Sequence, residues 1–139
     1  MSNALTQGED RWLDAVVFNA DGLVPVIAQE MDGGRVLMFA WADRASLRET
    51  QQSGLATYYS RSRARRWRKG EESGNAQNVR EIRIDCDGDV VLYRVEQRGG
   101  VACHTGRASC FFRRLDNGHW VEADPVLVDP RNMYGRELP

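Results

Sequence analysis

The segment from Val79 to Gln97, "VREIRIDCDGDVVLYRVEQ", constrains the fold more than any other part of the sequence. Apolar and polar residues alternate on both sides of Asp87-Gly88, a pair that favours a tight type I′ turn. With these two residues as the loop, Cys86 faces Asp89 across an antiparallel hairpin. One face of the hairpin then carries Cys86, Asp89, Ile82, Ile84, Val91, Tyr93 and Val95.

Strand patterns recur along the rest of the chain. A turn at 32–34 and another at 116–118 join neighbouring strands, while Asp43 and Gly54 are suited to begin and end one helix. Further strands are predicted at 23–31, 35–41, 55–60 and 109–115, and another from His119. Because alternation is the stronger signal throughout, we predict a mainly antiparallel β fold with one substantial helix, of the α+β class and without a βαβ crossover.

Length and composition bound the organisation and the location of the protein. A chain of 139 residues, 42% apolar and 28% charged, predicts one globular domain over 1–139 with a surface tail after Pro125. No run approaches the roughly 18 apolar residues of a membrane span, and the N-terminus lacks a secretory pattern. We therefore expect a cytoplasmic protein with no membrane partner, and the formal net charge of −1 argues against binding of long nucleic acids.

Positive charge is concentrated in one stretch, "SRSRARRWRKGEESGN" at 60–75. Six of the ten residues from Arg61 to Gly70 are arginine or lysine, with Trp67 among them. Such a cluster is typical of a phosphate-binding surface, for nucleic acid or for a small phosphorylated metabolite. Charge alone does not separate these two ligands.

The three cysteines lie within a short span that also contains acids and a histidine. Cys86, Cys103 and Cys110 are separated by sixteen and six residues, which is not the paired spacing of a zinc finger. An odd number of cysteines also argues against a disulfide framework. Three thiolates with one open position would form a catalytic zinc site, whereas free cysteines are also commonly buried core residues.

Other polar residues of this span could complete an active site. Asp85, Asp87 and Asp89 could share Mg²⁺, or could simply be the solvated residues of a turn. His104, next to Cys103, is a candidate general acid or base, or a solvated loop residue. His119 has no such neighbours and is interpreted as structural. The motifs of zincin proteases, nucleobase deaminases, Walker A loops and Rossmann domains do not occur.

Several segments together resemble the phosphoribosyl-AMP cyclohydrolases of histidine biosynthesis. They are "DGLVPVIAQ", "VLMFAWADRASL", "ATYYSRSRARRWRKGEESGNAQNV", "DCDGD" and "CHTGRASCF", in this order between Asn19 and Arg113. The resemblance implies one cyclohydrolase domain, an intertwined homodimer, and hydrolytic opening of the adenine ring of phosphoribosyl-AMP between N1 and C6. Asn75 departs from the pattern, because many members have histidine there.

The resemblance also implies a role for each motif residue. Zinc would be held by Cys86, Cys103 and Cys110 from both subunits, and Mg²⁺ by Asp85, Asp87 and Asp89. His104 would transfer the proton as activated water attacks C6. Trp67 could stack on the base or pack the loop. The substrate, with two phosphates, would contact Arg61, Arg63, Lys69, Ser73 and Gly74.

Two other functions fit part of the pattern. A zinc-stabilised RNA-binding module would use the basic, Trp-bearing segment as its contact surface. A structural dimer would use shared zinc only to hold its subunits together. The near-neutral charge, the carboxylate cluster and the ordered motifs favour the enzyme.

Overall fold

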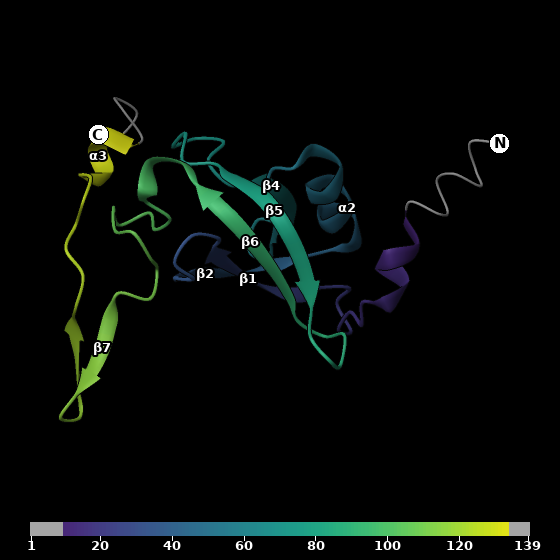
Figure 1. Ribbon diagram of the computed structural model, residues 1–139, viewed down its shortest axis with the longest axis horizontal. Coiled ribbons are helices and arrows are strands. Elements are labelled where there is room, and N and C mark those ends of the chain that lie inside the picture. The colour runs from purple at the N-terminus through teal and green to yellow at the C-terminus, as the bar shows by residue number, and fades with distance from the viewer. Residues whose placement is uncertain (1–9, 134–139) are drawn as a thin grey trace.

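The predicted hairpin forms one edge of the main sheet in the computed structural model, which describes residues 10–133 of the chain (Figure 1). Strand β5 (Gln77–Ile84) pairs antiparallel with β6 (Val91–Gln97). Ile84 lies opposite Val91 and Ile82 opposite Tyr93, which confirms the predicted register. An irregularity between Val79 and Glu81 shifts the remaining pairs by one residue.

The turn of this hairpin is longer than predicted. The Asp85 amide donates to the Val90 carbonyl at 3.0 Å, and the Gly88 amide donates to the Asp85 carbonyl at 3.1 Å. The turn therefore centres on Cys86 and Asp87, and Gly88 follows it with φ +77°, a left-handed conformation that glycine adopts without steric cost. The prediction that Cys86 faces Asp89 in the ladder is wrong: Cys86 lies on the turn, where it is exposed.

Six strands form the main sheet, in the order β4-β3-β2-β1-β6-β5. Strand β1 (Val24–Glu30) pairs antiparallel with β2 (Val36–Ala42), which continues through β3 (Thr57–Ser60) to β4 (Arg65–Arg68). The α+β class and the mainly antiparallel sheet are confirmed for a single small domain. The parallel pairing of β1 with β6 is a feature that the sequence did not indicate.

The main helix, α2 (Arg44–Ser53), begins and ends where the sequence predicts. Asp43 accepts hydrogen bonds from the Ser46 amide at 2.8 Å and from its hydroxyl at 2.5 Å. Gly54 ends the helix with φ +77°. Leu47 and Thr50 are buried on its inner face, where the Tyr93 hydroxyl donates to Thr50 Oγ1 at 3.1 Å.

We expect Asp43→Ala to lower the free energy of unfolding by about 1 kcal/mol. The substitution removes the side-chain acceptor for the Ser46 amide, which is one of the unpaired donors of the first helical turn. Urea denaturation followed by circular dichroism measures the effect. Asp43→Asn keeps an acceptor and should cost much less, so equal losses for the two variants would contradict the capping role.

The core joins β1, β6, α2 and β3. Val24, Val26, Leu47, Tyr58 and Tyr93 have no measurable exposure. The Tyr58 hydroxyl donates to Gln77 Oε1 at 2.6 Å, so the buried polar atoms of both side chains have a partner. Burial, and then the neighbouring Tyr93, raise the pKa of Tyr58 well above its ordinary value. Tyr58 is therefore held in its neutral form.

A second, two-stranded sheet stands away from the first (Figure 1). Strand β7 (Arg113–Asp116) pairs with β8 (His119–Glu122) around the predicted turn at Asn117-Gly118. The strand predicted at 109–115 thus begins later. The first residues of the predicted strand instead form hydrogen bonds with β2. The Ser109 hydroxyl donates to the Val36 carbonyl at 2.8 Å, and the Cys110 amide donates to the Leu37 carbonyl at 2.7 Å.

Three short helices complete the described chain. They are η1 (Arg11–Ala15), η2 (Arg98–Gly100) and α3 (Pro130–Met133). Within residues 10–133, no helix combines the length and the apolar character needed to cross a membrane. Because α3 lies after Pro125, part of the predicted tail is helical. The last residues of the tail, 134–139, lie outside the described range.

Candidate active site

The basic segment, for which no strand was predicted beyond residue 60, folds as a hairpin. Strand β4 pairs along its whole length with β3, so that Trp67 lies opposite Tyr58 and Arg65 opposite Ser60. The sequence of β4 has no apolar alternation, because only Trp67 turns to the core, where its ring centroid is 5.1 Å from that of Tyr58. Pairing with β3 therefore decides the conformation of this segment.

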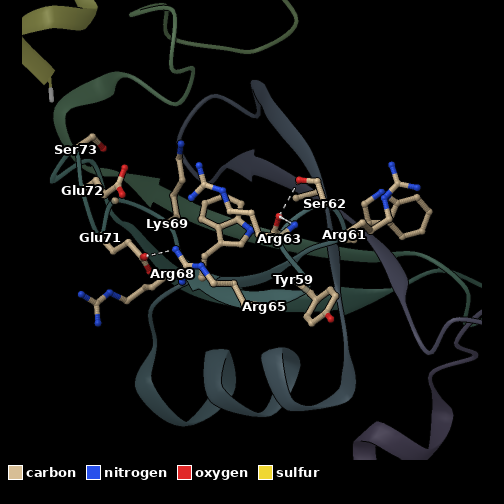
Figure 2. Close-up of a pocket in the computed structure, with 15 residues that line it drawn as sticks. Tyr59, Arg61, Ser62, Arg63, Arg65, Arg68, Lys69, Glu71, Glu72 and Ser73 are labelled. Atoms are coloured by element: carbon tan, nitrogen blue, oxygen red, sulfur yellow. Dashed lines mark hydrogen bonds and ion pairs between the residues drawn. The ribbon is translucent and has the colours of Figure 1, made fainter. Parts of the chain in front are cut away.

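A pocket of about 700 Å³ opens over this hairpin (Figure 2). Four of the five predicted substrate residues line it: Arg61, Arg63, Lys69 and Ser73. Gly74 is not among the lining residues, and its amide donates to the Gly70 carbonyl at 2.8 Å. Sequence reasoning missed other lining residues, which come from the register of β2, β3 and β4: Trp41, Tyr59, Arg65 and Arg68.

Charge in the pocket is only partly neutralised. Arg65 forms an ion pair with Glu71 at 3.2 Å, and the Arg68 amide donates to the same carboxylate at 2.8 Å. The backbone hydrogen bond from Arg68, with the Arg65 side chain, lowers the pKa of Glu71. Arg61 lies 4.7 Å from the centroid of the Trp41 ring, and neither it nor Arg63 belongs to an ion pair within residues 10–133. Both guanidinium groups can therefore receive an anion.

Lys69 joins the pocket to the loop that carries two of the cysteines. Its ammonium group donates to the carbonyl of Ala102, which directly precedes Cys103. Desolvation by the surrounding protein lowers the pKa of Lys69, and the thiols of Cys110 and Cys103 partly offset that effect. The residue predicted to bind phosphate therefore also fixes the cysteine loop against the pocket.

The loop from Ala102 to Cys110 brings Cys103 and Cys110 together. The Ala102 amide donates to the Ala108 carbonyl at 3.2 Å and the Cys103 amide to the Arg107 carbonyl at 3.1 Å, which closes a tight turn. Although the Cys110 residue is exposed, the surrounding protein desolvates its thiol and Cys103 adjoins it. Together these two effects raise the pKa of Cys110 to about 12. A bound cation would offset the cost of deprotonating two adjacent thiols, and a soft thiolate pair suits zinc.

Cys86 is not part of this pair. It lies on the β5–β6 turn, at the other end of β6 from the cysteine loop (Figure 1), and a strand of seven residues is about 23 Å long at 3.3 Å per residue. Within residues 10–133 of one chain, the three cysteines do not form a common metal site. A site with all three thiolates would need Cys86 from a second chain.

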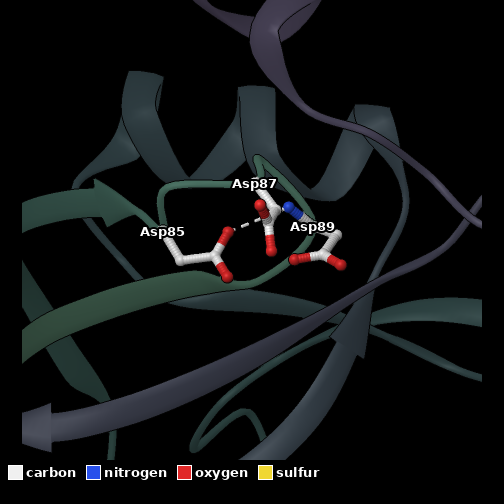
Figure 3. Close-up of side chains that lie close together, drawn as sticks. All are labelled: Asp85, Asp87 and Asp89. Atoms are coloured by element: carbon white, nitrogen blue, oxygen red, sulfur yellow. Dashed lines mark hydrogen bonds between the residues drawn. The ribbon is translucent and has the colours of Figure 1, made fainter.

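The three aspartates do come together, as the sequence predicts (Figure 3). One carboxylate oxygen from each of Asp85, Asp87 and Asp89 lies within 4.8 Å of the others. Asp85 Oδ1 accepts the Asp89 amide at 3.0 Å, which folds the turn. Interaction with the Asp85 carboxyl, with further repulsion from Asp87, raises the pKa of Asp89. A divalent cation could offset this repulsion.

The two histidines lie in different parts of the structure. His104 is exposed and follows Cys103 in the turn that places Cys103 beside Cys110. His119 is exposed at the start of β8, opposite Asp116. His104 is thus the histidine that the fold places beside the cysteine pair, while its chemical role stays a prediction.

Comparisons with known proteins agree on one family. The family model described as Phosphoribosyl-AMP cyclohydrolase matches residues 38–112, a range that includes the pocket, the three aspartates and the cysteine loop. A protein of that name from Marinobacter nauticus is 60% identical over 124 residues, 89% of this chain and 90% of its own. Proteins of the same name from Bordetella avium and Nitrosomonas europaea are 59% and 54% identical, and the matches cover 97% of each.

Proposed function

The chain belongs to the phosphoribosyl-AMP cyclohydrolase family of hydrolases in histidine biosynthesis, and from this premise we propose that it opens the adenine ring of phosphoribosyl-AMP with zinc and magnesium. The observation that carries the proposal is the basic pocket joined through Lys69 to a cysteine pair. Water adds to C6, the C6–N1 bond breaks, and N1 takes up a proton, which gives the phosphoribosylformimino carboxamide ribotide. The family assignment favours this enzyme over an RNA-binding module.

The pocket binds the phosphorylated nucleotide in this proposal. Arg61 and Arg63, which have no carboxylate partner among the described ion pairs, bind phosphate oxygens. Ser73 and the backbone near Gly74 complete the anion site. Trp67 packs on Tyr58 and also lines the pocket, so it can hold the base in position.

Cys103 and Cys110 of one subunit, with Cys86 of the other, would hold zinc. The adjacent desolvated thiols of Cys103 and Cys110 fit this metal, as does the exposure of Cys86. With three protein ligands, zinc would supply a Lewis acid that can activate water near neutral pH. Lys69 holds the loop at Ala102 and thereby sets the position of the cysteine pair relative to the pocket.

His104 transfers the proton in this proposal. An imidazole beside Cys103 can take the proton of the attacking water and return it to N1 when the ring opens. Asp85, Asp87 and Asp89 would hold Mg²⁺, which would neutralise phosphate or orient the substrate. Because Cys86 lies between Asp85 and Asp87, the magnesium and zinc sites would adjoin each other in a dimer.

The proposal is tested by turnover of phosphoribosyl-AMP, followed through the absorbance change of ring opening, with and without a zinc chelator. We expect turnover that the chelator abolishes and that added zinc restores. Folded, zinc-loaded protein that shows no turnover with Mg²⁺ present would overturn the proposal. Salt-sensitive RNA binding by the same sample would then point to the RNA-binding module.

We expect Arg63→Gln to raise KM about 10–100-fold with little change in kcat, because a charge-assisted hydrogen bond to phosphate contributes about 1.5–3 kcal/mol. Arg66→Gln is the matched control: Arg66 belongs to the same strand pair but lies 3.7 Å from Glu49 and does not line the large pocket. Steady-state kinetics on both variants gives the comparison. Equal KM values for the two variants would argue against phosphate binding by Arg63.

A further inference from the structure

A chain of hydrogen bonds in the interior has no part in the mechanism proposed above. Gln77, the first residue of β5, has no measurable exposure, and its Oε1 accepts the Tyr58 hydroxyl at 2.6 Å. Its Nε2 donates to Oε1 of Gln97 at 2.9 Å. Gln97, the last residue of β6, lies opposite Gln77 in the ladder and donates from Nε2 to the Asn75 carbonyl at 2.8 Å. Two glutamine side chains thus connect the core to the backbone at residue 75.

The Asn75 carbonyl fixes the direction of every bond in this chain. A carbonyl only accepts, so Nε2 of Gln97 must face it, and Oε1 of Gln97 must face Gln77. Gln77 then presents its Nε2 to Gln97, and the same Nε2 donates to the Met38 sulfur at 3.3 Å. Its Oε1 is left for Tyr58, whose hydroxyl must donate. One arrangement of the two amides therefore satisfies all these groups, and each bond supports the next.

The chain of hydrogen bonds reaches two parts of the pocket lining. At one end, Tyr58 packs against Trp67, which lines the pocket. At the other end it holds the segment 73–76, in which the Ser73 side chain also lines the pocket. The Ser73 hydroxyl accepts the Asn75 amide at 3.2 Å, so the position of the Asn75 backbone affects that of Ser73.

Gln97 also lies where this segment meets the chain that leads into the cysteine loop. Its Nε2 donates to the Arg98 carbonyl at 3.3 Å, and the Arg98 amide donates to the Ala76 carbonyl at 2.9 Å. The two segments are in close contact, because a Cβ on Gly99 would lie 2.4 Å from Oδ1 of Asn75. One side-chain amide therefore holds the pocket wall at 73–76 against the start of the segment 98–102.

We infer that Gln97 is a positioning residue, which sets the place of the pocket wall at 73–76 relative to the cysteine loop. The inference rests on the proposed function, in which a nucleotide bound in the pocket meets the cysteine pair. Lys69 attaches the loop to the pocket at Ala102, and Gln97 supplies a second attachment where β6 ends. A displacement of about 1 Å can cost a reaction about 100-fold in rate, so this attachment bears on turnover.

The first test compares Gln97→Met with Gln29→Met. Methionine is an unbranched side chain of similar length without an N–H group, so it keeps the packing and removes the donor. Gln29 is the matched control, because it is also partly buried and its Nε2 donates to the Gly34 carbonyl at 3.0 Å, outside the pocket lining. We expect Gln97→Met to lower kcat about 10–100-fold and to change KM less than about 3-fold, with zinc content retained. Gln29→Met should keep both constants.

Gln97→Glu tests the direction of the hydrogen bonds. Its carboxylate can still accept from Gln77 but cannot donate to the Asn75 carbonyl. We therefore expect kcat to fall at least as far as in Gln97→Met, although glutamate is closer to glutamine in shape. A kcat equal to that of the unmodified protein would overturn the inference, as would a fall in kcat that only follows a loss of bound zinc.

Hydrogen exchange followed by mass spectrometry tests the attachment independently of turnover. In Gln97→Met we expect the backbone amides of 70–76 and 98–103 to exchange about 10-fold faster, because the Asn75 carbonyl has lost its donor. Gln29→Met should leave both segments unchanged. Unchanged exchange in Gln97→Met overturns the inference. The expected exchange in a protein whose unmodified form has no turnover supports the attachment and overturns only the proposed function.

Discussion

Cys86→Ser and Cys110→Ser are each expected to lower turnover at least about 1,000-fold, since loss of a metal that contributes several kcal/mol to the transition state has an effect of this size. Mixing the two variants should restore part of the activity. Half of the dimers formed at random contain one subunit of each kind, and each such dimer has one intact site of two, so about a quarter of the original turnover returns. The measurement is the activity of the two variants after joint refolding.

The control for this experiment is the mixture of Cys103→Ser with Cys110→Ser. These residues adjoin each other in the same chain, so every site in any dimer that they form lacks a ligand, and no activity should return. Recovery in this control, or none in the first mixture although mass spectrometry shows mixed dimers, would contradict a zinc site shared in the proposed way. Zinc content measured on the same samples should follow the turnover.

Gly106→Ala is expected to lower the free energy of unfolding by about 2–5 kcal/mol. Gly106 has φ +87°, which costs an alanine about 1–2 kcal/mol. A Cβ there would lie 1.9 Å from the Val128 carbonyl oxygen, and overpacking of this kind adds about 1–3 kcal/mol. The Gly106 carbonyl also accepts the Leu127 amide at 2.8 Å, so the clash acts on the segment that packs beside the cysteine loop.

Gly118→Ala separates the two parts of this cost. Gly118 has φ +80°, but a Cβ there would meet no atom within 4 Å, so only the backbone term of about 1–2 kcal/mol should appear. Urea unfolding of both variants at one fixed protein concentration measures the difference, because the stability of a dimer depends on concentration. Equal losses would show that the segment at 126–128 moves aside freely.

The local signals of the sequence predict much of this fold. The helix lies between its caps Asp43 and Gly54 because a side-chain cap and a left-handed glycine act within a few residues. The alternation of apolar and polar residues in β5 and β6 indicates which side chains share a face. It thereby predicts the register of the two strands, including which residues lie opposite Val91 and Tyr93. Asp85, Asp87 and Asp89 of the β5–β6 turn lie together because they are neighbours in the sequence.

The sequence did not predict the contacts between distant segments of the chain. The parallel pairing of β1 with β6 and the strand at Arg65–Arg68 depend on partners elsewhere in the chain. No local periodicity of apolar residues predicts them. The hydrogen bond from Lys69 to the Ala102 carbonyl also depends on the packing of distant segments. The same is true of the separation between Cys86 and the cysteine pair. The sequence by itself determined which residue types are available for chemistry, because type and local conformation are local properties. Only the tertiary structure decided which of them share a site, because that depends on which segments pack against each other.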